Sequence, residues 1–311
     1  MKRRFFVALT VSCSALLALA SFASAQERLY GADGAGGNPA TNLYLINPAN
    51  GAVLQTLGPV GFGVTGLAVD PATGTLYGVT GGADDNNPGF LITVNKTNGA
   101  GTVVGDLFAS STSPVADITF TPDGTLYGWS ENTDDLVTID KATGAATVVG
   151  DSGTSTSGSG LASNAAGVLY FAGSGDDGPL RTVDRTTGAL TAVATMDGTL
   201  DRQLAALAFD AAGTLFGARL DDAGGSNPRP ADMVTIDPTT GAVTSRGPAI
   251  DRFDAIAFET VKPAKNPNCK KLRKKLKRQK KGLAKARTET KRAMIKENIA
   301  DTRRRLKKRG C

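Results

Sequence analysis

Histidine is absent from the whole chain of 311 residues. This absence removes the commonest general base of enzymes and the commonest protein ligand of metal ions. The chain also has no glycine-rich phosphate loop, no CxxC pair and no Ser/His/Asp set. Aromatic residues make up only 6% of the chain, and Trp129 is its single tryptophan. The sequence therefore lacks the common signatures of nucleophilic catalysis, thiol redox chemistry and phosphate binding.

Long apolar runs are equally scarce, and the one that exists lies at the N-terminus. Three basic residues at positions 2–4 precede an apolar run over residues 5–20, and Ala23-Ser24-Ala25 follows as a small-x-small cleavage site. This order predicts a secretory signal peptide, residues 1–25, cleaved after Ala25. We therefore expect a secreted, extracellular or periplasmic protein. A retained membrane anchor is the alternative, against which the cleavage motif argues.

Charge is distributed very unevenly along the chain. Residues 26–261 hold 10 Lys and Arg against 26 Asp and Glu, a net charge of −16, whereas residues 262–311 hold 22 against 3, a net charge of +19. We therefore expect two parts after the signal peptide: an acidic domain over 26–261, long enough for a large core, and a basic appendix over 262–311.

One short phrase occurs five times in the acidic part. It reads as a strand, a tight turn that opens with Asn or Asp and closes with Gly, and a second strand. Its five copies are YLINPANGAVLQTLG (44–58), ITVNKTNGAGTVVG (92–105), LVTIDKATGAATVVG (136–150), RTVDRTTGALTAVA (181–194) and MVTIDPTTGAVTSRG (233–247). Asp140, Asp184 and Asp237 are accordingly interpreted as turn formers rather than ligands.

A second strand-turn-strand phrase alternates with the first, so that each repeat of about 47 residues contains four strands. The chain enters the pattern in the middle of a repeat, at RLYGADG, and the missing first strand stands at the far end, as DAIAFET (254–260). These features predict an all-β, five-bladed β-propeller of four-stranded blades, in which the last strand completes the first blade. A linear β-solenoid is the alternative, but it does not explain why the two half-repeats complement each other.

The phrasing GTLYGV … LVTIDKATGAATVVG resembles the secreted bacterial propeller repeats grouped as quinoprotein-like and YVTN-like. The resemblance covers about residues 26–261 and implies the fold, whereas propellers of this kind have unrelated activities. Quinone-dependent dehydrogenases commonly carry an aromatic platform and basic residues near the cofactor. Trp129 follows an ordinary LYGW strand and is expected to pack in the core, so we expect no such cofactor here.

Acidic residues concentrate on one predicted face of the ring. The loops from second to third strand and from blade to blade share that face and carry most of the acids, notably Asp84, Asp85, Asp134, Asp135, Asp176, Asp177, Asp221 and Asp222. Such a face attracts cations, and carboxylates with loop carbonyls are the ligands that calcium prefers. We expect an unidentified ligand or a cation such as calcium on this face. A solvated surface that keeps an exported protein soluble is the alternative.

Two acids lie where the innermost strands begin, near the axis of the predicted ring. Asp117 is the only charged residue at the first position of an innermost strand, and Asp254 comes one residue before that position in the closing blade. Paired carboxylates are the equipment of glycoside hydrolysis, which five-bladed propellers are known to host. The sequence has none of the motifs of those glycosidases. A glycoside hydrolase-like enzyme at the funnel is therefore the alternative to a non-catalytic propeller.

The basic appendix is rich in helix formers and carries a thin apolar stripe that includes Leu272, Leu276 and Leu283. Cys13 belongs to the signal peptide, so the mature chain keeps Cys269 and Cys311, which bracket a segment whose midpoint is residue 290. We predict a helical hairpin that turns at 288–290 and is closed by one disulfide, worth about 4 kcal/mol in the chain-entropy model. A disordered basic tail with free or intermolecular thiols is the alternative.

So basic a module needs a polyanionic partner. The candidates are an anionic envelope polymer, anionic lipid headgroups, nucleic acid or the acidic face of the propeller itself, within one molecule or head to tail. Export argues against genomic DNA, and no aromatic residues are interleaved for base stacking. The sequence thus indicates an exported, non-catalytic binding or scaffold propeller that attaches to the cell envelope through residues 266–311.

Overall fold

The computed structural model describes residues 26–34, 41–81, 89–109, 114–156, 159–173, 178–196, 202–221, 230–261 and 267–308. The predicted signal peptide, residues 1–25, lies outside this range. The chain divides into two compact units, of which one is Glu27–Val261 and the other contains the helical hairpin. Each unit is described by itself.

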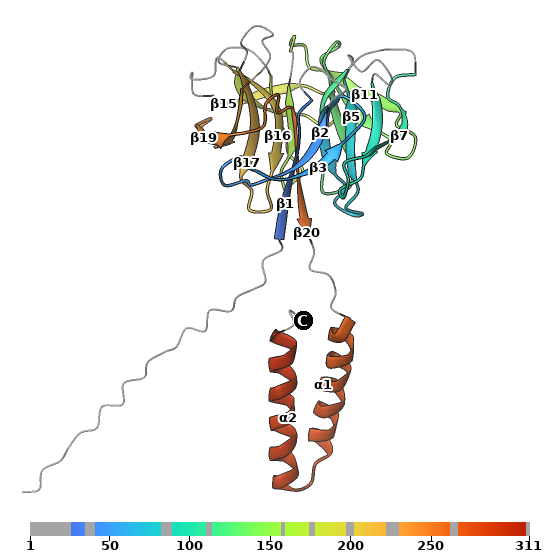
Figure 1. Cartoon of the computed structure of the whole chain (residues 1–311), viewed down its shortest axis with the longest axis vertical. Helices are drawn as coiled ribbons and strands as arrows, with labels where there is room; N and C mark the ends of the chain where they lie inside the picture. The colour runs from blue at the N-terminus through green and yellow to red at the C-terminus, as the bar shows by residue number, and fades with distance from the viewer. Residues whose placement is uncertain are drawn as a thin grey trace, which may run out of the picture. The chain divides into compact units, whose positions relative to one another are not determined.

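The first unit is a five-bladed β-propeller of four-stranded antiparallel blades, as the sequence predicts (Figure 1). The first blade, from its inner to its outer strand, consists of β20 (Ala255–Val261), β1 (Gln26–Ala32), β2 (Asn42–Ile46) and β3 (Val53–Pro59). The last strand of the propeller thus completes the first blade, which leaves the ring without a gap between its ends.

Each of the other blades is formed by four consecutive strands, the first of which is innermost. Blade 2 consists of β4 (Val64–Val69), β5 (Leu76–Thr80), β6 (Phe90–Val94) and β7 (Gly101–Asp106). Blade 3 consists of β8 (Val115–Phe120), β9 (Leu126–Ser130), β10 (Asp135–Ile139) and β11 (Ala146–Asp151). Blade 4 consists of β12 (Gly160–Ser163), β13 (Leu169–Ala172), β14 (Pro179–Val183) and β15 (Leu190–Thr195). Blade 5 consists of β16 (Arg202–Phe209), β17 (Leu215–Asp221), β18 (Ala231–Ile236) and β19 (Val243–Pro248).

The hydrophobic core lies between neighbouring blades. Five clusters of buried side chains each combine residues of two adjacent blades. Trp129 belongs to the cluster between blades 3 and 4, where it is fully buried and its ring lies 4.2 Å from that of Phe171. Its indole N–H donates to Oγ1 of Thr156 at 3.0 Å. Trp129 therefore packs in the core, as its strand context predicts.

The repeated turn between the third and fourth strands has the predicted geometry. In blade 3 the N–H of Ala142 donates to Oδ1 of Asp140 at 2.7 Å, and Gly144 has a φ of +83°. The turn glycine also has a second role that the sequence does not reveal. A Cβ on Gly144 would lie 2.6 Å from the carbonyl oxygen of Gly105, on the outer strand of blade 2. The same close approach to the preceding blade occurs at Gly51, Gly99, Gly188 and Gly241.

The second unit contains the predicted helical hairpin, formed by α1 (Pro267–Lys285) and α2 (Glu289–Lys308). Among the described side chains of the hairpin, only Ile299 and Thr302 are buried. The amide of Gln279 donates to the carbonyl oxygen of Asn298 at 3.2 Å and so links the two helices. No helix in the described part of the chain combines the length and the apolar character that crossing a bilayer requires.

Candidate functional site

The axis of the ring is surrounded by the free edges of five inner strands, β4, β8, β12, β16 and β20. Each inner strand has a partner on its outer side only, so alternate residues direct their backbone N–H and C=O groups toward the axis. Buried groups of this kind need hydrogen-bond partners, because leaving one without any costs about 1–3 kcal/mol. The side chains that fill the axis must therefore provide hydrogen-bond partners for these strand edges.

Asp117 supplies these partners at one end of the axis. It is fully buried, at 0% exposed. Its carboxylate accepts the N–H of Ile118 at 2.8 Å, of Leu161 at 3.0 Å and of Leu207 at 3.2 Å. These three donors occupy the same repeat position in blades 3, 4 and 5. Asp117 therefore ties together three inner strands, two of which belong to blades that are not adjacent.

The residues at the position of Asp117 in the other blades are small, namely Gly66, Gly160, Ala206 and Ala255. A Cβ on Gly66 would lie 3.0 Å from Oδ1 of Asp117, so the carboxylate occupies the space that larger side chains would need. Burial raises the pKa of the Asp117 carboxyl well above its usual range, and the negative charge of Asp254 adds to this effect. The three backbone N–H groups act in the opposite direction but do not cancel the effect of burial.

The two carboxylates that the sequence predicts at a funnel are therefore not open to solvent. Asp117 is enclosed, and Asp254 is 8% exposed, with its backbone N–H donating to the carbonyl oxygen of Ala32 at 3.0 Å. The structure places them near enough for their charges to interact. Because Asp117 is sealed from solvent and hydrogen-bonded to three strands, this geometry favours a structural role for it. The hydrolase hypothesis stays a prediction.

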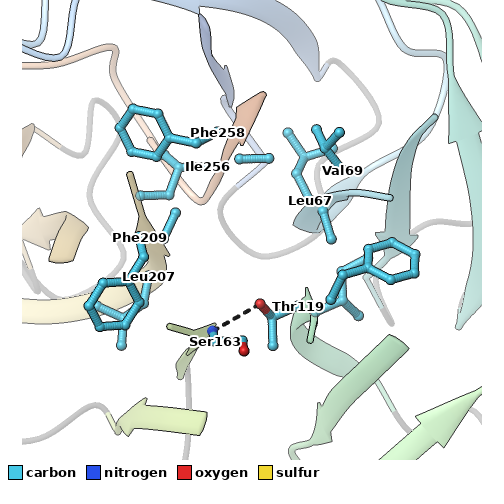
Figure 2. A pocket seen from close by; sticks show the side chains of 13 residues that line it. Leu67, Val69, Thr119, Ser163, Leu207, Phe209, Ile256 and Phe258 are labelled. Carbon is cyan, nitrogen blue, oxygen red and sulfur yellow. Dashed lines mark hydrogen bonds between the residues drawn. The ribbon is translucent and has the colours of Figure 1, made fainter. Parts of the chain in front are cut away.

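The opposite end of the axis contains a pit (Figure 2). Its deep section has a volume of about 100 Å³ and starts one residue beyond Asp117, among Leu67, Ile118, Leu207 and Ile256. One more backbone group of an inner strand finds its partner here, because Oγ1 of Thr119 accepts the N–H of Ser163 at 3.1 Å. The deep section thus lies next to the layer that contains Asp117.

The pit widens toward the turns that join the first and second strands of the blades. This mouth has a volume of about 340 Å³. Mouth and deep section share walls made by Val69, Phe120, Ser163, Phe209 and Phe258, which occupy the same repeat position in the five blades. The mouth therefore lies at the end of the ring opposite to the loops that carry the predicted acidic face.

Ion pairs join neighbouring blades at three junctions of this end of the ring. Lys141 of blade 3 pairs with Asp70 of blade 2 at 2.6 Å, and Arg185 of blade 4 pairs with Asp123 of blade 3 at 3.2 Å. In the same way, Lys96 of blade 2 pairs with Glu259 of blade 1. In each case the basic residue comes second in the repeated turn and the acid belongs to the preceding blade.

The pKa values of the acids follow from these pairs. Burial raises the pKa of Asp70. The hydrogen bonds from Lys141 and from the N–H groups of Ala72 and Thr73 together lower it by more, so that the pKa lies below its ordinary value. Burial and Lys96 act on Glu259 in the same two directions, again with a lowered pKa as the result. Sequence reasoning missed these pairs, although the alternation of Lys or Arg in the turns with acids one blade earlier was a usable signal.

Most residues of the predicted acidic face lie outside the described residues: Asp84, Asp85, Asp176, Asp177, Asp222 and the side chain of Asp221. Asp134 and Asp135 are described and half-buried. Oδ1 of Asp134 accepts the N–H of Thr156 at 2.7 Å, which is a loop-closing contact. Within the described ranges, no three acidic, histidine or cysteine residues gather in a way that could hold a metal ion. The calcium hypothesis stays a prediction.

Cys269 lies in α1, and Cys311 lies outside the described residues. The disulfide between them therefore remains a prediction.

Comparisons with known proteins agree with the fold and go no further. No protein-family model and no curated protein matches the chain. A chain in the crystal structure of a nidogen/laminin complex superposes with a TM-score of 0.50 at 12% identity, covering 75% of this chain and 98% of that one. A gluconolactonase from Xanthomonas campestris superposes with a TM-score of 0.44 at 13% identity, covering 73% and 78%. At 12% identity the first likeness shows the fold alone, and no argument is built on the second.

Proposed function

We propose that this propeller is an exported, non-catalytic binding or scaffold protein, and that its helical hairpin attaches it to an anionic envelope polymer or an anionic lipid surface. Propellers serve many functions, so the fold does not choose among them. The proposal is supported chiefly by the arrangement of charge on the hairpin.

The observation that carries the proposal is a stripe of lysines on α1. Lys270, Lys274, Lys277 and Lys281 follow the i, i+4, i+7, i+11 spacing of one helix face, and all four are exposed. The partly buried Leu272, Leu276 and Leu283 occupy the other side of the helix. The lysines are therefore directed away from the contact between the helices and are accessible to a partner.

This stripe works against the stability of its own helix. Like charges at i, i+4, such as Lys270 with Lys274 and Lys277 with Lys281, destabilise a helix by about 0.2–0.5 kcal/mol per pair. α1 has ten basic residues and no acidic one, so nothing within the helix offsets this repulsion or complements the positive N-terminal end of its dipole. α2, in contrast, begins with Glu289 and pairs Arg305 with Asp301 at 2.9 Å. A polyanion would remove the repulsion in α1, which is the physical reason to expect one as the partner.

Sedimentation with isolated cell envelopes tests the proposal. We expect the full-length protein to sediment with envelopes at low salt and to be released as salt rises, because exposed charges are screened over about 10 Å at 0.1 M. Replacing Lys270, Lys274, Lys277 and Lys281 by Gln should weaken binding at least about tenfold, since each basic residue near an anionic surface contributes on the order of 1 kcal/mol. The matched control replaces the same four residues by Arg and should bind as the natural protein does.

Two further arms separate the sources of negative charge. Vesicles of phosphatidylglycerol compared with vesicles of phosphatidylcholine test the lipid surface, and lipid-free anionic envelope polymer tests the polymer. Binding that is unchanged by the four Gln replacements would move recognition away from the lysine stripe. A sugar-hydrolysing activity that is lost in Asp117→Asn would replace the non-catalytic proposal with the hydrolase alternative.

A further inference from the structure

The junction between blades 5 and 1 keeps the acid of the ion-pair pattern but has no basic residue at the matching turn position. Asp210 of blade 5 occupies the repeat position of Asp70 and Glu259, each of which pairs with a lysine of the next blade. The next blade after blade 5 is blade 1, whose turn has Pro48 where blades 2 and 3 have lysine. Blade 1 thus has no lysine at the position that would face Asp210, and Oδ1 of Asp210 accepts the N–H of Thr214 at 2.7 Å.

A second carboxylate lies at the same junction. Oε1 of Glu27, on β1, accepts the N–H of Ala211 at 2.6 Å, which places Glu27 against the turn that begins with Asp210. Both acids line the mouth of the axial pit, and the described lining of the mouth includes no Lys or Arg. The rim of the mouth is thus negatively charged at this junction, whereas lysines pair with Glu259 and Asp70 at two other junctions.

The wall next to the two acids is aromatic. Phe209 and Phe258 line both sections of the pit and come from blades 5 and 1, the blades that carry Asp210 and Glu27. Each ring packs against a second aromatic ring that does not line the pit: the ring centroids are 5.3 Å apart for Phe209 and Tyr170 and 5.1 Å apart for Phe258 and Phe216. The rings are therefore held in place before a ligand arrives, which reduces the entropy lost on binding.

We propose that the mouth of the pit binds a small organic cation with a ring-sized apolar body. The body lies against Phe209 and Phe258, and the ammonium group points to Glu27 and Asp210. The volume of about 340 Å³ falls in the range of small-molecule pockets, about 300–1,000 Å³. An apolar cavity of about 150 Å³ holds benzene, so the ring fits the mouth but not the deep section of about 100 Å³. This site does not depend on the hairpin or on its partner.

Phenethylamine is a suitable probe, and phenylacetate, a carboxylate of similar size, is its counterpart of opposite charge. The full-length protein is titrated with each at millimolar concentration while the backbone amide resonances of Ser163 and Phe209 are followed. We expect phenethylamine to shift both resonances and to bind at least about tenfold more tightly than phenylacetate, with an affinity that falls as salt rises. Equal affinity for the two probes, or no shift at these amides, overturns the proposal.

Variants identify the groups involved. In Glu27→Gln with Asp210→Asn, each new amide keeps an oxygen for the same backbone N–H but has no charge, and phenethylamine binding should weaken about five- to tenfold. The matched control is Asp123→Asn, an acid of the equivalent turn in blade 3 that pairs with Arg185 and does not line the mouth. Ala165→Trp, at an exposed lining position, should obstruct the mouth and weaken binding of the amine without unfolding the ring. Undiminished binding in either the double variant or Ala165→Trp overturns the proposal.

Discussion

The propeller and the hairpin use charge in opposite ways. In the propeller, two acids are held by hydrogen bonds: Asp117 is buried among backbone N–H groups, and Asp70 is paired with Lys141 of the next blade. In the hairpin, ten basic residues crowd α1 without an acidic partner in the same helix. The hydrogen bonds of these two acids contribute to the stability of the propeller, whereas the crowded positive charges of α1 oppose the stability of their helix. This difference indicates that α1 is the place to search for a binding partner, because charges that destabilise their own helix are available to bind opposite charge.

Removing the axial carboxylate should have the largest effect on the propeller. Asp117→Ala leaves the buried N–H groups of Ile118, Leu161 and Leu207 without their acceptor. At about 1–3 kcal/mol for each such group, we expect a loss of about 3 kcal/mol or more in the free energy of unfolding. Denaturant titration measures this loss. The comparison variant Asp123→Ala removes an exposed acid and should cost less than Asp117→Ala. Equal losses would remove the structural role assigned to Asp117.

The turn glycines should show the next largest effect. Gly144→Ala forces a residue with a Cβ into a φ of +83° and against the carbonyl oxygen of Gly105. We expect a loss of about 2–3 kcal/mol, of which about 1–2 kcal/mol comes from the left-handed conformation alone. Gly124→Ala is the matched control, because its φ is +87° and nothing lies within 4 Å of the new Cβ. Equal melting temperatures of the two variants would show that the contact between blades is not tight.

Breaking an ion pair between blades should cost less. Lys141 is 40% exposed, but its partner Asp70 is 1% exposed, so Lys141→Gln leaves an acid with little access to water. We expect a loss of about 1–2 kcal/mol at neutral pH, and a smaller loss for Arg185→Gln, whose partner Asp123 is exposed. Because the native pKa of Asp70 is lowered, its contribution is present above about pH 4 and is lost as pH falls further. The cost of Lys141→Gln should therefore disappear in acid, and a cost that persists there would contradict this explanation.

Asp117 should impose the opposite pH dependence. Its native pKa is raised, so between the ordinary value of about 3.9 and the native value the folded state binds more protons than the unfolded state. Stability contributed by the protonated acid is thus lost as pH rises through this window. The stability of the natural protein relative to Asp117→Asn should be greatest in acid and decline toward neutral pH. Urea unfolding at a series of pH values measures the difference, and a constant difference would show that Asp117 has an ordinary pKa.

The smallest effect is expected in the hairpin. Lys274→Gln removes like-charge repulsion with Lys270 and Arg278, so the helicity of the hairpin should rise by the equivalent of a few tenths of a kcal/mol. Raising the salt concentration should remove the difference between the variant and the natural protein, because salt screens the repulsion. Circular dichroism detects the change, and Lys274→Arg is the control that keeps the charge. A lower helicity in the Gln variant would mean that Lys274 stabilises the hairpin.

Local sequence signals account for much of this structure. Asp140, Asp184 and Asp237 form turns as their spacing predicts, and the strand at 255–261 completes the blade that begins at Gln26. These features were predictable because each depends on a few adjacent residues or on the count of half-repeats.

The contents of the axis were not predictable in the same way. The sequence places Asp117 near the axis, but its burial results from three inner strands that meet only in the closed ring. The negative sector of the pit likewise depends on Glu27 and Asp210, which come from opposite ends of the propeller sequence. Spacing along the sequence carries no information about which groups of distant blades share one cavity.

Asp117 also limits how symmetric this protein can become. Five repeats of one identical sequence would place either five aspartates or none at the axis. Five carboxylates would repel one another in a space that now holds one, and none would leave inner-strand N–H groups without acceptors. A consensus propeller built from this repeat should therefore fold well only if one copy differs from the other four at that position. The ring has near five-fold regularity on its outside and requires one exception at its centre.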